Sequence, residues 1–209
     1  GAALPLLAGA ASAQLELQPR SGQPVNGLTS AELDAFEAGK TVFNVPQTEA
    51  SGLGPIFNDI SCGNCHSTPA IGGSSVRTVT RFGKSAQGGM PFDPLESLGG
   101  SLLQEQAFQG SCEEMVPPEA DVIAQRLTPT ALGGGLLSLI DDADIDLNVV
   151  MQPPGINGFP NPVPLLEDPN APPRYAKFGW KGVIATAHSF GFDASAGELS
   201  LTTSVIPNN

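Results

Sequence analysis

The chain has 209 residues, of which 40% are hydrophobic, and its 9 basic against 21 acidic side chains produce a formal net charge of −12. This length and composition are sufficient for one globular domain with a hydrophobic core. The acidic balance, without any basic cluster, makes nucleic acid and anionic membranes unfavourable partners. The 25 glycines and 20 prolines predict many turns and irregular loops.

The first 13 residues, GAALPLLAGAASA, carry no charge and end in Ala11-Ser12-Ala13, a small-x-small pattern typical of a signal-peptide cleavage site. We interpret residues 1–13 as the remnant of a secretory signal peptide and residues 14–209 as one mature domain. The alternative is a flexible apolar tail. No other stretch approaches the length that a membrane span requires, so the sequence predicts an exported protein, periplasmic or extracellular.

A first helix is expected from about residue 31 to 42. Thr29 and Glu32 have the spacing of a capping box, and hydrophobic residues follow at near-helical spacing. Residues 44–54 are expected to form a loop. Residues 55–59, which begin with a proline, are then the expected start of a short helix.

That short helix is expected to present the sequence CGNCH, which consists of Cys62, two intervening residues, Cys65 and His66. This is the attachment pattern of a c-type haem. On a helical turn the spacing places both sulfurs on one side, where each can bond a vinyl group of the haem. His66 follows directly and is the expected proximal ligand of the iron. The sequence therefore predicts one covalently bound haem c.

Two other interpretations of the cysteines are weaker. A thioredoxin-like CxxC requires a preceding strand and a βαβ frame, and the sequence GLGPIFNDIS before the motif has no such pattern. A structural zinc site requires two more ligands at short spacing, whereas only Cys112 and His188 remain, both distant in the sequence.

The elements after the motif are expected to be short. Residues 76–82 alternate β-branched with polar side chains and predict a strand or one arm of a hairpin. Residues 141–144 indicate an acidic turn, and residues 152–173 carry eight prolines that exclude regular structure. Further helices are expected at residues 101–109, 119–127, 136–139 and 182–196.

Five segments, in order, resemble the bacterial di-haem oxidoreductases, a family of peroxidases and thiol oxidoreductase-like proteins. They are GLGPIFNDISCGNCH, FDPLESLGGSLLQEQA, VPPEADVIAQRLTPTALGGGLL, INGFPN and KFGWKG, and the resemblance covers most of residues 30–206. It implies an exported, mainly α, cytochrome c-like haem domain with long Gly/Pro-rich loops and redox chemistry. Family members usually carry a second CxxCH in a C-terminal domain, which this sequence lacks. The chain is therefore either a fragment or a single-haem relative.

Electron transfer favours an iron whose sixth coordination position is also filled. Met90, in a Gly-rich loop 24 residues after His66, is the first candidate for the sixth ligand, because a loop there can fold over the distal face of the haem. His188, on the last expected helix, is the second candidate. Met115 and Met151 are weaker ones. For each of them, packing in the core is the alternative role.

Peroxide chemistry requires instead an open distal site with an acid–base group. The segment from Gln104 to Met115 is similar to the distal Gln and Glu segment of bacterial di-haem peroxidases. By that resemblance Glu114 would move the peroxide proton and Gln106 would position the oxygens. The alternative is a helix with solvated carboxylates.

Three functions stay open at this stage, because all of them use Cys62, Cys65 and His66. The first is an exported c-type cytochrome that transfers electrons to and from a redox partner protein. The second is a haem peroxidase, or a fragment of a di-haem enzyme. The third is a haem-bearing structural subunit that associates with copies of itself into an electron-conducting assembly.

Overall fold

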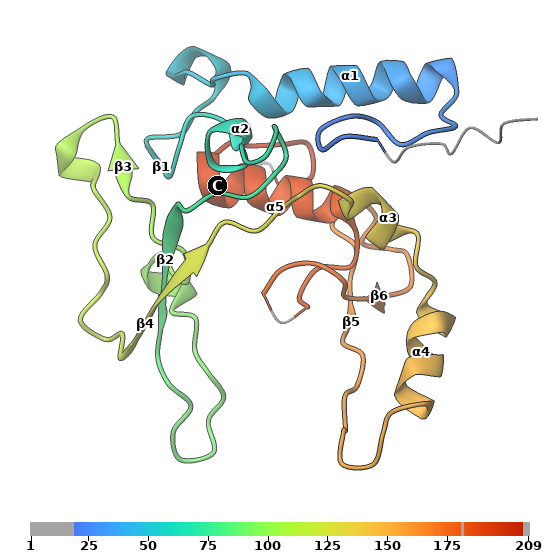
Figure 1. Ribbon diagram of the computed structural model, residues 1–209. Coiled ribbons are helices and arrows are strands. Elements are labelled where there is room, and N and C mark those ends of the chain that lie inside the picture. Colours follow the sequence, from blue (N-terminus) through green and yellow to red (C-terminus); the bar gives the residue numbers. More distant parts are fainter. Residues whose placement is uncertain (1–18, 181, 207–209) are drawn as a thin grey trace, which may run out of the picture.

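Short helices and short antiparallel strands alternate along the part of the chain that the structure, a computed structural model, describes, residues 19–180 and 182–206 (Figure 1). The helices are α1 (Ser30–Asn44), α2 (Cys62–Cys65), α3 (Gly134–Ser138), α4 (Asp142–Val150) and α5 (Ala187–Leu199). The strands are β1 (Ile56–Phe57), β2 (Thr78–Gly83), β3 (Gln106–Ala107), β4 (Val122–Leu127), β5 (Pro162–Val163) and β6 (Arg174–Tyr175). Helices account for 29% of the residues and strands for 14% of them. The expectation of a mainly α, cytochrome c-like fold is therefore wrong.

The largest sheet is the reason for that correction. The strand expected at 76–82 is confirmed as β2, but the helix expected at 119–127 is wrong, because β4 pairs with β2 there from Thr78↔Leu127 to Gly83↔Val122. Side chains of β4 alternate between half-buried and exposed, as strand geometry requires. The cross-strand partner therefore outweighs the weak local helix preference of this segment.

The segment before β4 is also extended where a helix was expected. Within residues 101–109 the chain forms β3, which pairs with β1 through Ile56↔Ala107 and Phe57↔Gln106. The backbone amide of Leu103 donates to the carbonyl oxygen of Thr80 in β2 at 3.0 Å. This amide therefore bonds to a neighbouring strand and not to a carbonyl of a helical turn. The helix start expected at 55–59 is wrong for the same reason, because β1 lies there.

The helices at the two ends of the domain follow local signals more closely. The helix expected at 31–42 is confirmed as α1, and Thr29 and Glu32 form the capping box. The last helix begins at Ala187 and not at 182, because Gly182 holds a left-handed backbone with φ of 65° and Thr186 then caps the helix.

In the C-terminal half, the helix expected at 136–139 is confirmed in part by α3. The acidic turn expected at 141–144 is wrong, because Asp142 begins the nine-residue α4. Acidic side chains in a first helical turn are stabilised by the helix dipole, which explains the difference. The proline-rich segment 152–173 is irregular as expected, except for β5, which pairs with β6.

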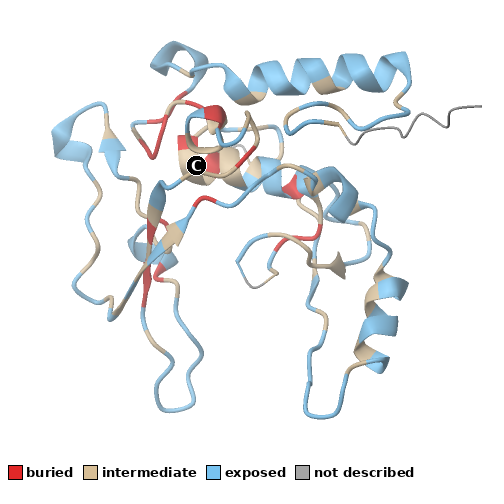
Figure 2. Cartoon of the chain, viewed as in Figure 1, coloured by how far each residue is buried: buried red, intermediate tan, exposed pale blue. Residues whose placement is uncertain are grey.

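The small core lies beside CGNCH. Leu53, Phe57 and Leu199 form a buried cluster, and Cys62 packs against it. Figure 2 shows that buried residues concentrate near α2 and along β2, while α1 and α4 are largely exposed. α2 contacts α1, and α5 contacts β1. The segment that carries the motif is therefore held between the first and the last helix.

No helix in the described ranges is long and apolar enough to cross a membrane. The predicted signal-peptide remnant, residues 1–13, lies outside the described residues.

Candidate haem attachment site

The two thiols of CGNCH lie on the single turn of α2. The turn is capped at its start by Ser61, whose side chain accepts a hydrogen bond from the backbone amide of Asn64 at 3.2 Å. It is closed at its end by His66, whose backbone amide donates to the carbonyl oxygen of Cys62 at 2.9 Å. Cys62 and Cys65 are both free and half-buried. The structure thus brings the predicted attachment residues together.

Gly63 allows α2 to approach the end of α1 closely. A Cβ atom at this position would lie 2.4 Å from Oδ1 of Asn44, which is closer than real side chains tolerate. A larger residue between the two cysteines would therefore force the Asn44 side chain to move.

The ring of His66 is oriented by a hydrogen bond that the sequence did not reveal. Its Nδ1 lies 3.1 Å from the carbonyl oxygen of Gly73. A carbonyl oxygen only accepts, so Nδ1 carries a proton and the lone pair of the neutral ring is on Nε2. Among the described residues Nε2 has no hydrogen-bond partner. A backbone carbonyl on the other ring nitrogen is a usual feature of metal-binding histidines.

The conformation of the loop after His66 places the Gly73 carbonyl oxygen next to the His66 ring. A Cβ atom on Gly73 would lie 2.0 Å from the carbonyl oxygen of Thr68, so only glycine fits there. The amide of Gly72 also donates to the carbonyl oxygen of His66 at 2.8 Å. The available sequence signal was the Gly72-Gly73 pair, which indicates a tight turn close behind the motif.

The two thiols of CGNCH lie in a partly buried environment. Burial raises the pKa of the Cys62 thiol, and burial raises that of Cys65 to about 11. A raised pKa lowers the fraction of thiolate, which is the form that a redox-active CxxC motif uses. No group of three or more His, Cys, Asp or Glu side chains in the described residues could hold a metal ion. Two thiols and one oriented imidazole are the side chains that the predicted haem attachment would use.

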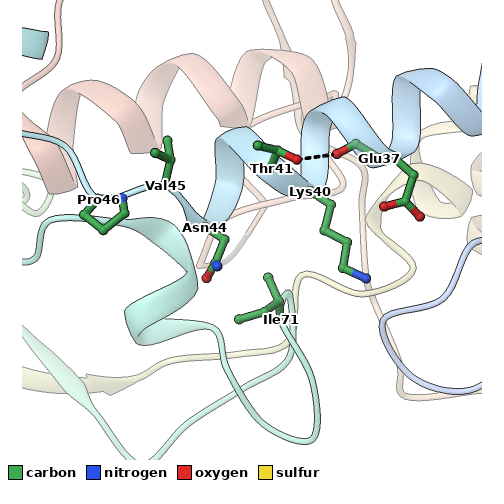
Figure 3. Close-up of a pocket in the computed structure, with 7 residues that line it drawn as sticks. All are labelled: Glu37, Lys40, Thr41, Asn44, Val45, Pro46 and Ile71. Atoms are coloured by element: carbon green, nitrogen blue, oxygen red, sulfur yellow. Dashed lines mark hydrogen bonds between the residues drawn. The ribbon is translucent and has the colours of Figure 1, made fainter.

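A cavity of about 440 Å³ lies next to the motif, between the C-terminal half of α1 and the loop after His66 (Figure 3). Its lining mixes polar and apolar side chains and comprises Glu37, Lys40, Thr41, Asn44, Val45, Pro46 and Ile71. Neither thiol nor His66 lines it. We therefore do not assign this cavity to the haem.

The predicted sixth ligands do not lie against His66. Met90 is 70% exposed in the loop after β2, which Figure 1 shows running away from α2. His188 lies in the first turn of α5 with its ring 4.8 Å from that of Phe192. The other end of α5, at Leu199, is about 16 Å away along the helix axis, and it is this end that packs near Cys62. Both assignments stay predictions.

Met115 and Met151, the weaker candidates, are both largely exposed.

The two residues expected to act on peroxide make structural hydrogen bonds. Nε2 of Gln106 donates to the carbonyl oxygen of Asn58 at 2.5 Å. Oε2 of Glu114 accepts from the backbone amide of Gln104 at 2.8 Å. No hydrogen bond or ion pair in the described part of the chain joins Gln106 to Glu114 or either of them to His66. Their catalytic roles stay predictions.

Comparison of the chain with protein-family models, with curated proteins and with solved structures produced no match. The resemblance to the di-haem oxidoreductases therefore remains a sequence-based prediction.

Proposed function

We propose that this chain is an exported c-type cytochrome that carries one haem, bonded to Cys62 and Cys65, and exchanges electrons with a redox partner protein. When bound, the haem supplies a one-electron iron couple. The observation that carries the proposal is the pairing of His66 Nδ1 with the Gly73 carbonyl oxygen directly beside two free thiols.

Each residue of the motif has a distinct part in this function. Cys62 and Cys65 would bond the haem vinyl groups, and His66 would bind the iron through Nε2. The Gly73 carbonyl fixes the orientation of the imidazole, because it holds Nδ1 and leaves Nε2 for the iron. The ring of Phe43 lies edge-on to that of His66, with 5.9 Å between centroids, and limits water access on that side.

The first test is haem attachment in a host that matures c-type cytochromes. The wild-type chain is expected to carry one haem that survives denaturation, detected by haem staining and by intact mass. Cys62→Ser with Cys65→Ser should abolish attachment. Cys112→Ser is the matched control, because Cys112 is an exposed thiol outside α2, and it should retain the haem. A wild-type chain without covalent haem would refute the proposal.

The second test separates electron transfer from peroxide chemistry. Electron transfer predicts sharp low-spin spectra, ferric and dithionite-reduced, that carbon monoxide leaves unchanged, because the protein fills both axial positions. A high-spin spectrum that shifts with carbon monoxide would contradict electron transfer and favour a peroxidase. His66→Ala should lose the native spectrum while still attaching haem.

A further inference from the structure

Asp59, three residues before α2, is bonded to the CGNCH turn by both of its carboxylate oxygens. Its Oδ1 accepts from the backbone amide of Ile60 and from Nδ2 of Asn64, each at 2.7 Å. Its Oδ2 accepts from the thiol of Cys65 at 3.8 Å. One side chain therefore holds both a backbone atom before the turn and two side chains within it.

A cation from a different segment neutralises this carboxylate. Nη1 of Arg77 lies 2.5 Å from Oδ2 of Asp59, and Arg77 precedes β2. The Asp59 side chain is only 11% exposed, so its charge is poorly solvated and depends on Arg77. The pair connects the motif to the β2–β4 sheet.

The two cysteines are held by different contacts. Cys62 packs against the apolar cluster of Leu53, Phe57 and Leu199. Cys65 instead contacts the Asp59 carboxylate. Removal of that carboxylate should therefore disturb the direction of the Cys65 thiol more than that of Cys62.

We propose that Asp59 is a positioning residue that directs the Cys65 thiol toward its vinyl group, an inference that rests on the proposed function. In this step the S–H bond adds across the vinyl double bond. Sulfur bonds to the vinyl carbon next to the porphyrin ring, and the hydrogen goes to the terminal carbon. The addition is redox-neutral and needs no co-reactant. Asp59 touches neither iron nor porphyrin in this role and acts through Cys65.

The test compares thioether bonds in the full chain carrying Asp59→Ala with those in the wild type. Peptide mass analysis locates the haem on Cys62, Cys65 or both. The pyridine haemochrome provides a second readout, because its α-band moves to longer wavelength when a vinyl group stays unbonded. We expect most of the haem-bearing Asp59→Ala protein to be bonded through Cys62 alone, with a red-shifted α-band.

Two substitutions separate positioning from general stability. Arg77→Gln breaks the ion pair but leaves the Asp59 carboxylate beside Cys65, and it should keep both thioethers. Asp59→Asn changes the carboxylate itself. It keeps the size of the side chain and one acceptor oxygen for Asn64, but it places an amide nitrogen where Oδ2 accepts from Cys65. We expect the single-thioether form here as well, even where Asp59→Ala fails to fold. Asp121→Asn, which removes a carboxylate bonded to Ser85 in a remote loop, is the matched control and should keep both thioethers.

The results of the thioether analysis distinguish failure of this inference from failure of the proposed function. Wild-type proportions of both thioethers in Asp59→Asn would overturn this inference alone. Equal loss of attachment at both cysteines would also overturn it, because that pattern indicates a purely structural role. A wild-type chain without haem would overturn the proposed function and this inference with it.

Discussion

Asn58 and Glu198 are joined by two hydrogen bonds across 140 residues of sequence. The backbone amide of Asn58 donates to the carbonyl oxygen of Glu198, and its Nδ2 donates to Oε2 of the same residue, both at 2.8 Å. Asn58 lies just after β1 and close before α2, whereas Glu198 lies in the last turn of α5. This contact fixes the C-terminal helix to the segment that leads into the CGNCH motif.

Asn58→Ala should lower the free energy of unfolding by about 1–3 kcal/mol, because it leaves the carboxylate of Glu198 without a donor in a largely buried site. Urea unfolding measures the change. Glu119→Ala, which removes an exposed glutamate, is the control and should be within about 0.5 kcal/mol of the wild type.

The double variant Asn58→Ala with Glu198→Ala should cost less than the sum of the two single variants, because both remove the same bond. Strict additivity would contradict the contact.

Gly73→Ala should destabilise the protein by about 1–3 kcal/mol and alter the visible spectrum of the haem, because the added Cβ would lie 2.0 Å from the carbonyl oxygen of Thr68 and displace the partner of His66 Nδ1. Thermal unfolding and the ferrous spectrum measure the two effects. In the control Gly135→Ala, the new Cβ in α3 meets nothing within 4 Å, and stability should be unchanged or slightly higher. A native spectrum in Gly73→Ala would count against the bond.

Acid sensitivity should arise in part from Asp142. The Arg174 guanidinium, which bonds its carboxylate at 2.9 and 3.2 Å, holds the pKa of Asp142 at about 2, below the ordinary value of 3.8. A lowered folded-state pKa contributes stability above the unfolded value, and that contribution is lost as the pH falls from about 4 to about 2. With solvent screening it is worth about 1 kcal/mol.

Asp142→Asn should therefore be less stable than the wild type at neutral pH, and the difference should vanish near pH 2. Denaturant unfolding at a series of pH values measures this. Asp144→Asn, an exposed neighbour on the same helix, should show no such pH-dependent difference. A constant gap between Asp142→Asn and the wild type across this range would contradict the prediction.

The number of free thiols should report whether the proposed haem is bonded to the CGNCH motif. The chain has three cysteines, and Cys112 is exposed and free. In the haem-bearing protein under denaturing conditions only Cys112 should react with a thiol reagent, because Cys62 and Cys65 are then thioethers. Cys112→Ser should show no reactive thiol. Three reactive thiols in the wild-type protein would mean that no thioether had formed.

Local signals predicted some elements correctly. The capping box of Thr29 and Glu32 and the spacing of the following apolar residues predicted α1, because both act within one or two turns of chain. The alternation of residues 76–82 predicted β2 for a similar reason. By contrast, the sequence of β4 was mistaken for a helix. Its strand partner, β2, lies more than 30 residues earlier in the sequence, and no local pattern indicates that the two segments pair.

The sequence by itself determined the candidate chemistry: Cys62, Cys65 and His66 are adjacent in the chain, and their spacing alone places two thiols and an imidazole on one turn. Only the tertiary structure decided what holds that turn in place. The Gly73 carbonyl that orients His66 and the Asp59 carboxylate that contacts Cys65 depend on how the loop and the turn fold. Hydrogen bonds need distances within a few tenths of an ångström, and such distances are set by packing and not by residue order.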